Sequence, residues 1–241
     1  KADFMFDQAK VSLMDRGIVY AYPMVRGTRY FDDEWYLTGL NLRRIEHFMD
    51  VSAFLKQNIT QRVGIYAEGL SGSVLALSAM MREPLLFDAV AVHNPITDLT
   101  GYLFEQYAKS STRKTQLMEE FGDIENEQIY NILKLMSPYH IPFVEGYKYQ
   151  TDLLMTYDDS DKDTEAHSRK FIAKMREVNS RGDFMFMKKL NPMEATPSLQ
   201  KINSYSFLAL SLLFRSKNKQ PGYDKAIEEQ RFKSKLDEYD N

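Results

Sequence analysis

The sequence has no cysteine, no long apolar run and little excess of charge, and each absence excludes a class of protein. Without cysteine the 241-residue chain can form neither a disulfide nor a thiolate metal site, and its compartment cannot be read from redox chemistry. No stretch reaches the roughly 18 apolar residues expected of a membrane span. A formal net charge of −3 argues against nucleic-acid binding through a basic surface. Neither a histidine–carboxylate metal spacing nor a glycine-rich phosphate loop is found, so no cofactor is expected.

The residues that are present predict an α/β domain. Hydrophobic residues make up 44% of the chain, enough for one good-sized core. Apolar runs of strand length alternate with segments of helical periodicity, and this alternation predicts a mostly parallel sheet with helices on both faces. Strands are expected at 18–25, 62–67, 87–95, 152–157 and 183–190. Helices are expected at 4–14, 42–57, about 69–82, within 99–135, and at 163–178 and 199–213.

The composition changes after Phe214. Residues 215–241 read "RSKNKQPGYDKAIEEQRFKSKLDEYDN", which is highly charged with scattered apolar residues. We therefore expect a globular domain over 1–214 and a charged tail over 215–241. Two roles stay open for the tail: a solvated segment, or an arm that orders when it binds a partner.

A short motif, "GLSGS" at residues 69–73, is G-x-S-x-G with serine in place of the last glycine. It follows a predicted strand and precedes a predicted helix, which is the context of a nucleophile elbow. Such a turn places the oxygen of Ser71 at the carboxyl edge of the sheet. There the backbone N–H of the next residue, Gly72, can bind an oxyanion.

Four further segments share an order and spacing with this motif: "MDRGIVYAYPMVRG" (14–27), "HFMDVSAFL" (47–55), "REPLLFDAVAVHNPITDL" (82–99) and "FGDIENEQIYNILKLMSPYHI" (121–141). Together they resemble the catalytic domain of the prolyl oligopeptidase family, most closely oligopeptidase B, over about residues 3–214. The resemblance implies an α/β-hydrolase-type sheet that lacks its first strands, and a serine peptidase triad.

The resemblance places Ser71 on the nucleophile and Asp161 on the acid, in the loop after the strand at 152–157. A slip in register would promote one of three neighbours instead: Asp158, Asp159 or Asp163. A second interpretation stays open, because an acidic loop in this place can simply cap the helix at 163–178.

The family's histidine position falls on Pro192-Met193, or one residue later on Glu194. Only His93 is expected at a strand's carboxyl end beside the elbow; the other histidines are His47, His140 and His167. A serine hydroxyl is a weak nucleophile without an adjacent base, and losing the histidine costs about 10⁶ in kcat in a serine protease. The sequence therefore predicts a catalytically inactive hydrolase domain that serves as a structural or interaction subunit. The alternative is an active serine hydrolase whose base is Glu194 or His93.

The resemblance also implies that a strand is missing. The family's second oxyanion donor resembles a tyrosine in a Tyr-Gly-x-x-Gly turn, and neither this turn nor its strand is found in the sequence. That strand would lie between the strands expected at 18–25 and 62–67. An empty place there would leave buried backbone groups unpaired, at about 1–3 kcal/mol each. We therefore expect an upstream polypeptide, or a protein partner in a multi-subunit complex, to supply the strand, and the chain alone to be insoluble or molten.

Overall fold

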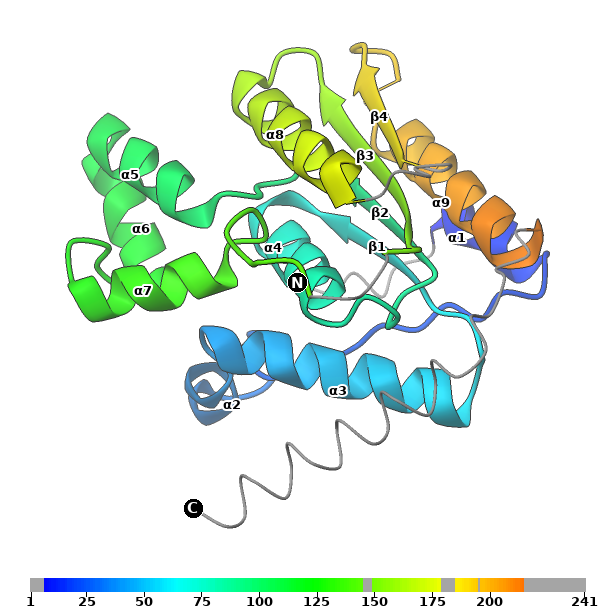
Figure 1. The fold of residues 1–241 in the computed structure, drawn as a ribbon, viewed down its shortest axis with the longest axis horizontal. Coiled ribbons are helices and arrows are strands. Elements are labelled where there is room, and N and C mark those ends of the chain that lie inside the picture. Colours follow the sequence, from blue (N-terminus) through cyan, green and yellow to red (C-terminus); the bar gives the residue numbers. More distant parts are fainter. Residues whose placement is uncertain (1–6, 145–148, 179–184, 195, 215–241) are drawn as a thin grey trace.

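The computed structural model describes residues 7–144, 149–178, 185–194 and 196–214 (Figure 1). These residues contain a sheet of four parallel strands in the order β1-β2-β3-β4. The strands are β1 (Gly64–Glu68), β2 (Ala89–His93), β3 (Asp152–Asp158) and β4 (Met185–Leu190). The predicted fold class, a parallel sheet of α/β-hydrolase type with helices on both faces, is confirmed.

The helices fall close to their predicted places: α1 (Gln8–Met14), α3 (Leu42–Asn58), α4 (Gly69–Arg82), α8 (Lys162–Val178) and α9 (Pro197–Phe214). The helical stretch predicted within 99–135 consists of α5 (Leu99–Lys109), α6 (Ser111–Phe121) and α7 (Glu127–Met136). A short helix, α2 (Asp33–Thr38), was not predicted. Residues 4–6 and 183–184, as well as the tail, lie outside the described residues.

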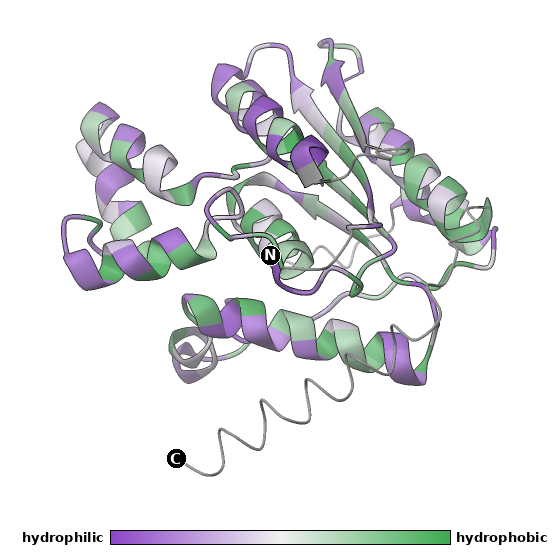
Figure 2. Cartoon of the chain, in the orientation of Figure 1, coloured by the Kyte–Doolittle hydropathy of each residue, from purple (hydrophilic) through white to green (hydrophobic). Residues whose placement is uncertain are grey.

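The side chains of β2 show why continuous apolar runs form the strands. Ala89 and Ala91 pack with α1 and α9 on one face of the sheet, where their small size lets the helices approach closely. Val90 and Val92 point to the other face and join the core formed with α3, α4 and α8. Figure 2 shows apolar residues along these central strands and many polar residues on the visible side of α8. Both faces are therefore buried, which is why the strand lacks a polar alternation.

The helices α5, α6 and α7 form a group at one side of the molecule (Figure 1). They enclose an apolar core of their own, which reaches the main body through α3 and α4; its members include Ile45, Val74, Leu103, Leu117, Phe121 and Leu133. Glu120 of α6 accepts a hydrogen bond from Ser71, which follows β1 closely in the chain. The group of helices therefore reaches the carboxyl end of β1.

The strand predicted at 18–25 is not formed, and that prediction is wrong. The segment has no strand pairing, although Ile18 and Tyr20 pack on the α1–α9 side and Val25 is buried in the main core. Within the described part of the chain, β1 pairs only with β2, and no strand pairs with its other edge. A strand needs a neighbour for its backbone groups, and segment 18–25 has none beside it.

Candidate functional site

Ser71 lies at the start of α4, directly after β1, with its side chain exposed. The left-handed backbone of this turn falls on Gly69, whose φ is +68°. Among the described residues the only non-glycine residues with positive φ are Asn41 and Asn94. In a nucleophile elbow the serine itself occupies a sharp, strained turn. Here the strained position is two residues earlier, and Ser71 lies in the first turn of the helix.

The N–H of Gly72, the expected oxyanion donor, is not free, because α4 begins at Gly69 and this N–H is the first in the helix to have an intrahelical acceptor, the carbonyl of the N-cap residue Glu68. N–H groups in the first turn of a helix have no intrahelical acceptor, and a helix N-terminus favours negative charge. The N-cap residue of α4, Glu68, makes no side-chain cap hydrogen bond that would occupy these donors. The N–H groups of α4 without an intrahelical acceptor are therefore those of Gly69, Leu70 and Ser71, and the expected donor Gly72 is not among them.

The hydroxyl of Ser71 is held by a carboxylate of α6. Ser71 Oγ donates to Oε1 of Glu120 at 3.1 Å, and the same oxygen accepts from Nη1 of Arg44 at 2.8 Å. Proton transfer from Ser71 to Glu120 would discharge the Arg44–Glu120 ion pair. The contact thus anchors the hydroxyl, and it takes the place in which a triad would have an imidazole.

Arg44 also fixes the loop that precedes α2. Its Nη2 donates to the carbonyl of Gly27 at 2.6 Å. Gly27 has a φ of +87°, and a Cβ there would stand only 2.2 Å from the carbonyl oxygen of Gly39. The N–H of Gly27 donates to the carbonyl of Trp35 at 3.1 Å. Glycine is thus required at this point, and Arg44 links the loop to the neighbourhood of Ser71.

Asp161, the expected acid, caps α8. Its Oδ1 accepts from the N–H of Thr164 at 3.1 Å and its carbonyl accepts from the N–H of Glu165 at 3.2 Å. The neighbouring carboxylates are engaged with lysines: Asp159 with Lys189, and Asp163 with Lys109 at 3.4 Å. These contacts are those of the helix-capping interpretation. No hydrogen bond joins Asp161 to a histidine in the described part of the chain.

His93 ends β2 and is buried, with 5% of its surface exposed. Its Nδ1 lies 2.9 Å from Oγ1 of Thr156, and its Nε2 lies 3.6 Å from Oδ1 of Asp158. Burial lowers the pKa of His93 below its ordinary value, against the opposing effects of Asp158 and Glu68. His93 therefore faces the acidic loop as a neutral imidazole, and none of the described hydrogen bonds connects it to Ser71.

Two other histidines surround Asp98, the N-cap of α5. Nε2 of His140 lies 3.1 Å from Oδ1 of Asp98, and Nδ1 of His167 accepts from the N–H of Asp98 at 3.3 Å. Burial lowers the pKa of His167 as well. The fourth, His47, lies on α3. All four histidines fall within the described residues, and three of them hold structural contacts away from the elbow.

The loop after β4 holds the expected histidine position. Met193 is 80% exposed there, next to Pro192. Oε1 of Glu194 accepts from Nζ of Lys188 at 2.9 Å, and this hydrogen bond, with one from the N–H of Asn191, holds the pKa of Glu194 below its ordinary value. A carboxylate with a lowered pKa is a weaker base at neutral pH.

Two general findings complete the site. Within the described ranges, no three histidine or carboxylate side chains gather as a metal site would require. In the same residues, no helix combines the length and apolarity needed to cross a membrane. The Ser71–Glu120–Arg44 contact was missed at the level of sequence because it joins three helices far apart in the chain, and no local pattern marks it.

Comparison with known proteins identifies the family. The profile of the prolyl oligopeptidase family matches residues 4–197. Dipeptidyl aminopeptidase BI of Pseudoxanthomonas mexicana is 25% identical over 180 residues, which cover 73% of this chain and 24% of that protein. Protease 2 of Moraxella lacunata is 25% identical over 192 residues, 78% of this chain and 27% of that protein.

Solved structures agree on the fold. One from a study of two prolyl endopeptidases superposes with a TM-score of 0.69 at 24% identity, over 86% of this chain and 32% of that one. Prolyl oligopeptidase B from Galerina marginata gives 0.69 at 20% identity, over 83% and 29%. The chain thus spans about a quarter to a third of the length of these relatives. With the strand–helix order and the matched profile in agreement, the chain belongs to the prolyl oligopeptidase family.

Proposed function

We propose that this chain is a catalytically inactive hydrolase domain of the prolyl oligopeptidase family that acts as a structural or interaction subunit of a larger assembly. The observation that carries the proposal is the partner of Ser71. Its hydroxyl is bound to Glu120, a carboxylate already paired with Arg44, and no described hydrogen bond links it to a histidine.

The surroundings of the other triad positions support the same conclusion. Asp161 caps a helix, and His93 is bound to Thr156 beside Asp158. His93 contacts the carboxylate of Asp158, but no described hydrogen bond joins Ser71 to His93, so a relay from serine through imidazole to carboxylate is broken at its first step. Removing the base from such a relay leaves roughly 10³–10⁴ over water, supplied by an oxyanion hole and binding alone.

The alternative is a serine hydrolase with an altered base. Glu194 and His93 are the candidates from sequence, and the contact of Ser71 with Glu120 adds a third candidate, which is the second carboxylate. A carboxylate base works best near its own pKa, so this enzyme would be most active at acid pH, near about pH 4–5.

Labelling with a fluorophosphonate probe, alongside hydrolysis of a peptide ester with a basic residue from pH 4 to 9, separates the two. We expect labelling no stronger than in Ser71→Ala and a flat hydrolysis rate, with Moraxella lacunata protease 2 as the positive control. Labelling that disappears in Ser71→Ala would overturn the proposal. Activity that peaks near about pH 4–5 would also overturn the proposal. The variant that loses this activity, among Glu194→Gln, Glu120→Gln and His93→Asn, would identify the base.

A further inference from the structure

A pocket of about 700 Å³ lies at the end of α4 opposite to Ser71. Its lining consists of Met81 and Arg82 of α4, Asn131, Lys134 and Leu135 of α7, and residues 140–144. We call it the α7 pocket. Along α4, Ser71 and Arg82 are about 16 Å apart at the helical rise of about 1.5 Å per residue. The α7 pocket is therefore separate from the elbow.

The ionisable side chains that line the α7 pocket are all basic. Arg82 and Lys134 are cationic and His140 can become so, while none of the described carboxylates lines the pocket. Glu46 of α3 attracts Arg82 but is not part of the lining. The ion pairs of the described residues do not include Lys134. In a chain with a formal net charge of −3, the pocket is thus a local excess of positive charge.

The backbone carbonyls beside the pocket already have donors. The carbonyl of Leu135, in the last turn of α7, accepts from Nη2 of Arg82 at 2.7 Å. The carbonyl of Met81, in the last turn of α4, accepts from the hydroxyl of Tyr149 at 2.8 Å. The ammonium group of Lys134 is therefore not required to cap these two helix ends, and it stays available to a ligand.

The wall formed by residues 140–144 is fixed by contacts outside the pocket. Nε2 of His140 lies 3.1 Å from Oδ1 of Asp98, and the N–H of His140 donates to the carbonyl of Ser137 at 2.9 Å. Nζ of Lys174 donates to the carbonyl of Ile141. Within the described residues, Nδ1 of His140 makes no hydrogen bond. The wall is thus ordered in advance of binding, which reduces the entropy cost of binding.

The rest of the lining is apolar. It consists of Met81, Leu135, Ile141, Pro142, Phe143 and Val144. The ring of Phe143 packs edge-on against Tyr149, with 5.5 Å between the ring centroids. A volume of about 700 Å³ falls within the roughly 300–1,000 Å³ of small-molecule sites, which combine such a lining with a few polar groups. The pocket therefore suits a small ligand with an apolar body and a negative charge.

The helix ends at the pocket indicate how much negative charge the ligand carries. Both α4 and α7 end there, and a helix C-terminus carries partial negative charge. Phosphate groups are typically held at helix N-termini, and no described helix begins at this pocket. A head group with one negative charge, bound by side chains alone, is therefore the better match.

We propose that the α7 pocket binds a small carboxylate with an aromatic or branched apolar body. Arg82, Lys134 and His140 would hold the carboxylate, and the apolar residues would cover the body. The inference goes beyond the proposed interaction role, and it does not depend on whether Ser71 reacts.

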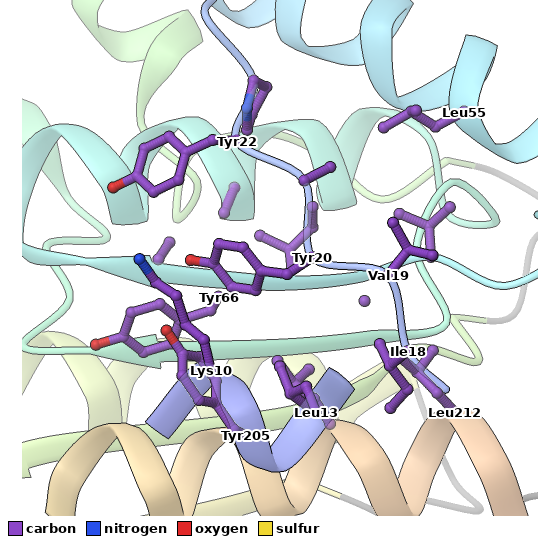
Figure 3. A pocket seen from close by; sticks show the side chains of 18 of the residues that line it. Lys10, Leu13, Ile18, Val19, Tyr20, Tyr22, Leu55, Tyr66, Tyr205 and Leu212 are labelled. Carbon is purple, nitrogen blue, oxygen red and sulfur yellow. The ribbon is translucent and has the colours of Figure 1, made fainter. Parts of the chain in front are cut away.

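A second pocket supplies the matched control for this assignment. It has a volume of about 1160 Å³ and lies along the unpaired edge of β1 (Figure 3). Lys10 lines it, but its ammonium group lies over the rings of Tyr20 at 5.1 Å and Tyr22 at 5.5 Å. An apolar anion that bound there would depend on Lys10 and not on Lys134.

The test is a calorimetric titration of the full chain with 2-naphthoate at pH 7. We expect saturable binding with a dissociation constant of about 1 mM or less. The neutral isostere 2-naphthamide should bind about tenfold more weakly, because it cannot form charge-assisted hydrogen bonds. The doubly charged 2-naphthyl phosphate should bind no more tightly than 2-naphthoate.

Two pairs of variants locate the site. Lys134→Gln should weaken the binding of 2-naphthoate by about threefold to fivefold, whereas Lys10→Gln should leave it unchanged. Leu135→Glu places a like charge in the pocket and should weaken binding by about tenfold or more. Its control is Leu37→Glu on α2, since Leu135 and Leu37 are 53% and 62% exposed. Circular dichroism and urea midpoints compare the folding of each variant with that of the parent chain.

Several outcomes would overturn the proposal. Absence of saturable binding up to about 5 mM 2-naphthoate, or equal binding of 2-naphthamide, would exclude recognition of the carboxylate. Binding that is weakened by Lys10→Gln but not by Lys134→Gln or Leu135→Glu would assign the ligand to the pocket beside β1. Tighter binding of 2-naphthyl phosphate would assign the pocket to phosphate esters. Because the readout is binding, failure here is distinguishable from labelling at Ser71.

Discussion

At Ser71 the hydroxyl hydrogen is directed to a carboxylate oxygen that also accepts from Arg44. A general base must be free to take a proton as the nucleophile attacks, and a neutral imidazole does so without breaking an ion pair. Glu120 would have to give up its charge beside a guanidinium whose exposed fraction is only 13%. The ion pair with Arg44 thus makes Glu120 a poorer general base for Ser71 than a neutral imidazole would be.

The stability of the fold is most sensitive to the residue type at Gly27, whose backbone packs directly against that of Gly39. We expect Gly27→Ala to lower the free energy of unfolding by about 3 kcal/mol or more, because left-handed strain adds to overlap with backbone atoms. Gly17 is the matched control: its φ is +75°, but a Cβ there would meet no atom of a non-adjacent residue within 4 Å. Gly17→Ala should cost only about 1–2 kcal/mol. Urea denaturation measures both losses, and equal losses would contradict the packing argument.

Among the elements, α5 depends on its N-cap. Oδ1 of Asp98 accepts from the N–H of Gly101 at 3.0 Å and from Thr100 at 2.9 Å, and it contacts His140. Burial would raise the pKa of Asp98, but these hydrogen bonds outweigh burial and hold it below its ordinary value.

Removal of this cap should cost more than removal of an exposed one. We expect Asp98→Ala to reduce the free energy of unfolding by about 2 kcal/mol and Ser110→Ala, at the start of α6, by about 0.5–1 kcal/mol. Because the pKa of Asp98 is lowered in the folded state, its side chain stabilises the fold only while it is ionised. The difference in free energy of unfolding between Asp98→Ala and Ser110→Ala should therefore shrink below about pH 4. Urea midpoints at neutral and acid pH measure this, and a difference that is constant with pH would contradict it.

The elements also show how far a sequence can be interpreted. Buried strands such as β2 and β3 were predictable because both of their faces are apolar, and that pattern is local. Segment 18–25 has the same pattern but forms no strand, because strand formation requires a neighbour that composition does not reveal. At the site, Ser71 was visible in a motif, whereas Glu120 and Arg44 reach it through tertiary contacts alone.

For the whole molecule, pH should affect stability through two histidines, the buried His93 and the half-buried His167. The pKa values of His93 and His167 are both lowered by burial. A folded state that resists protonation loses stability as pH falls below the unfolded value of about 6.5, because the unfolded chain binds the protons. We therefore expect the free energy of unfolding to decrease from about pH 7 to pH 5, by at most about 1.4 kcal/mol per pH unit for each histidine.

Urea denaturation across this pH range tests the sign of the change. The double variant His93→Asn and His167→Asn should flatten the dependence, whereas His47→Asn, on α3, should retain it. An increase in stability towards pH 5 would show that attraction to Asp158 and Asp98 outweighs burial at these positions.

Trp35 is the only tryptophan; it lies on α2, and its carbonyl accepts from the N–H of Gly27 in the loop that Arg44 holds in place. Its ring packs edge-on against Phe31, with 4.9 Å between the ring centroids, and Arg26 lies over it at 5.7 Å. The chain has no cysteine either, so a single engineered thiol would carry a dye at one chosen place. The chain thus has one tryptophan as a natural fluorescence donor, on α2, and no native cysteine that would also react with an acceptor dye. It is therefore suited to energy-transfer measurements with a single engineered cysteine and no other change.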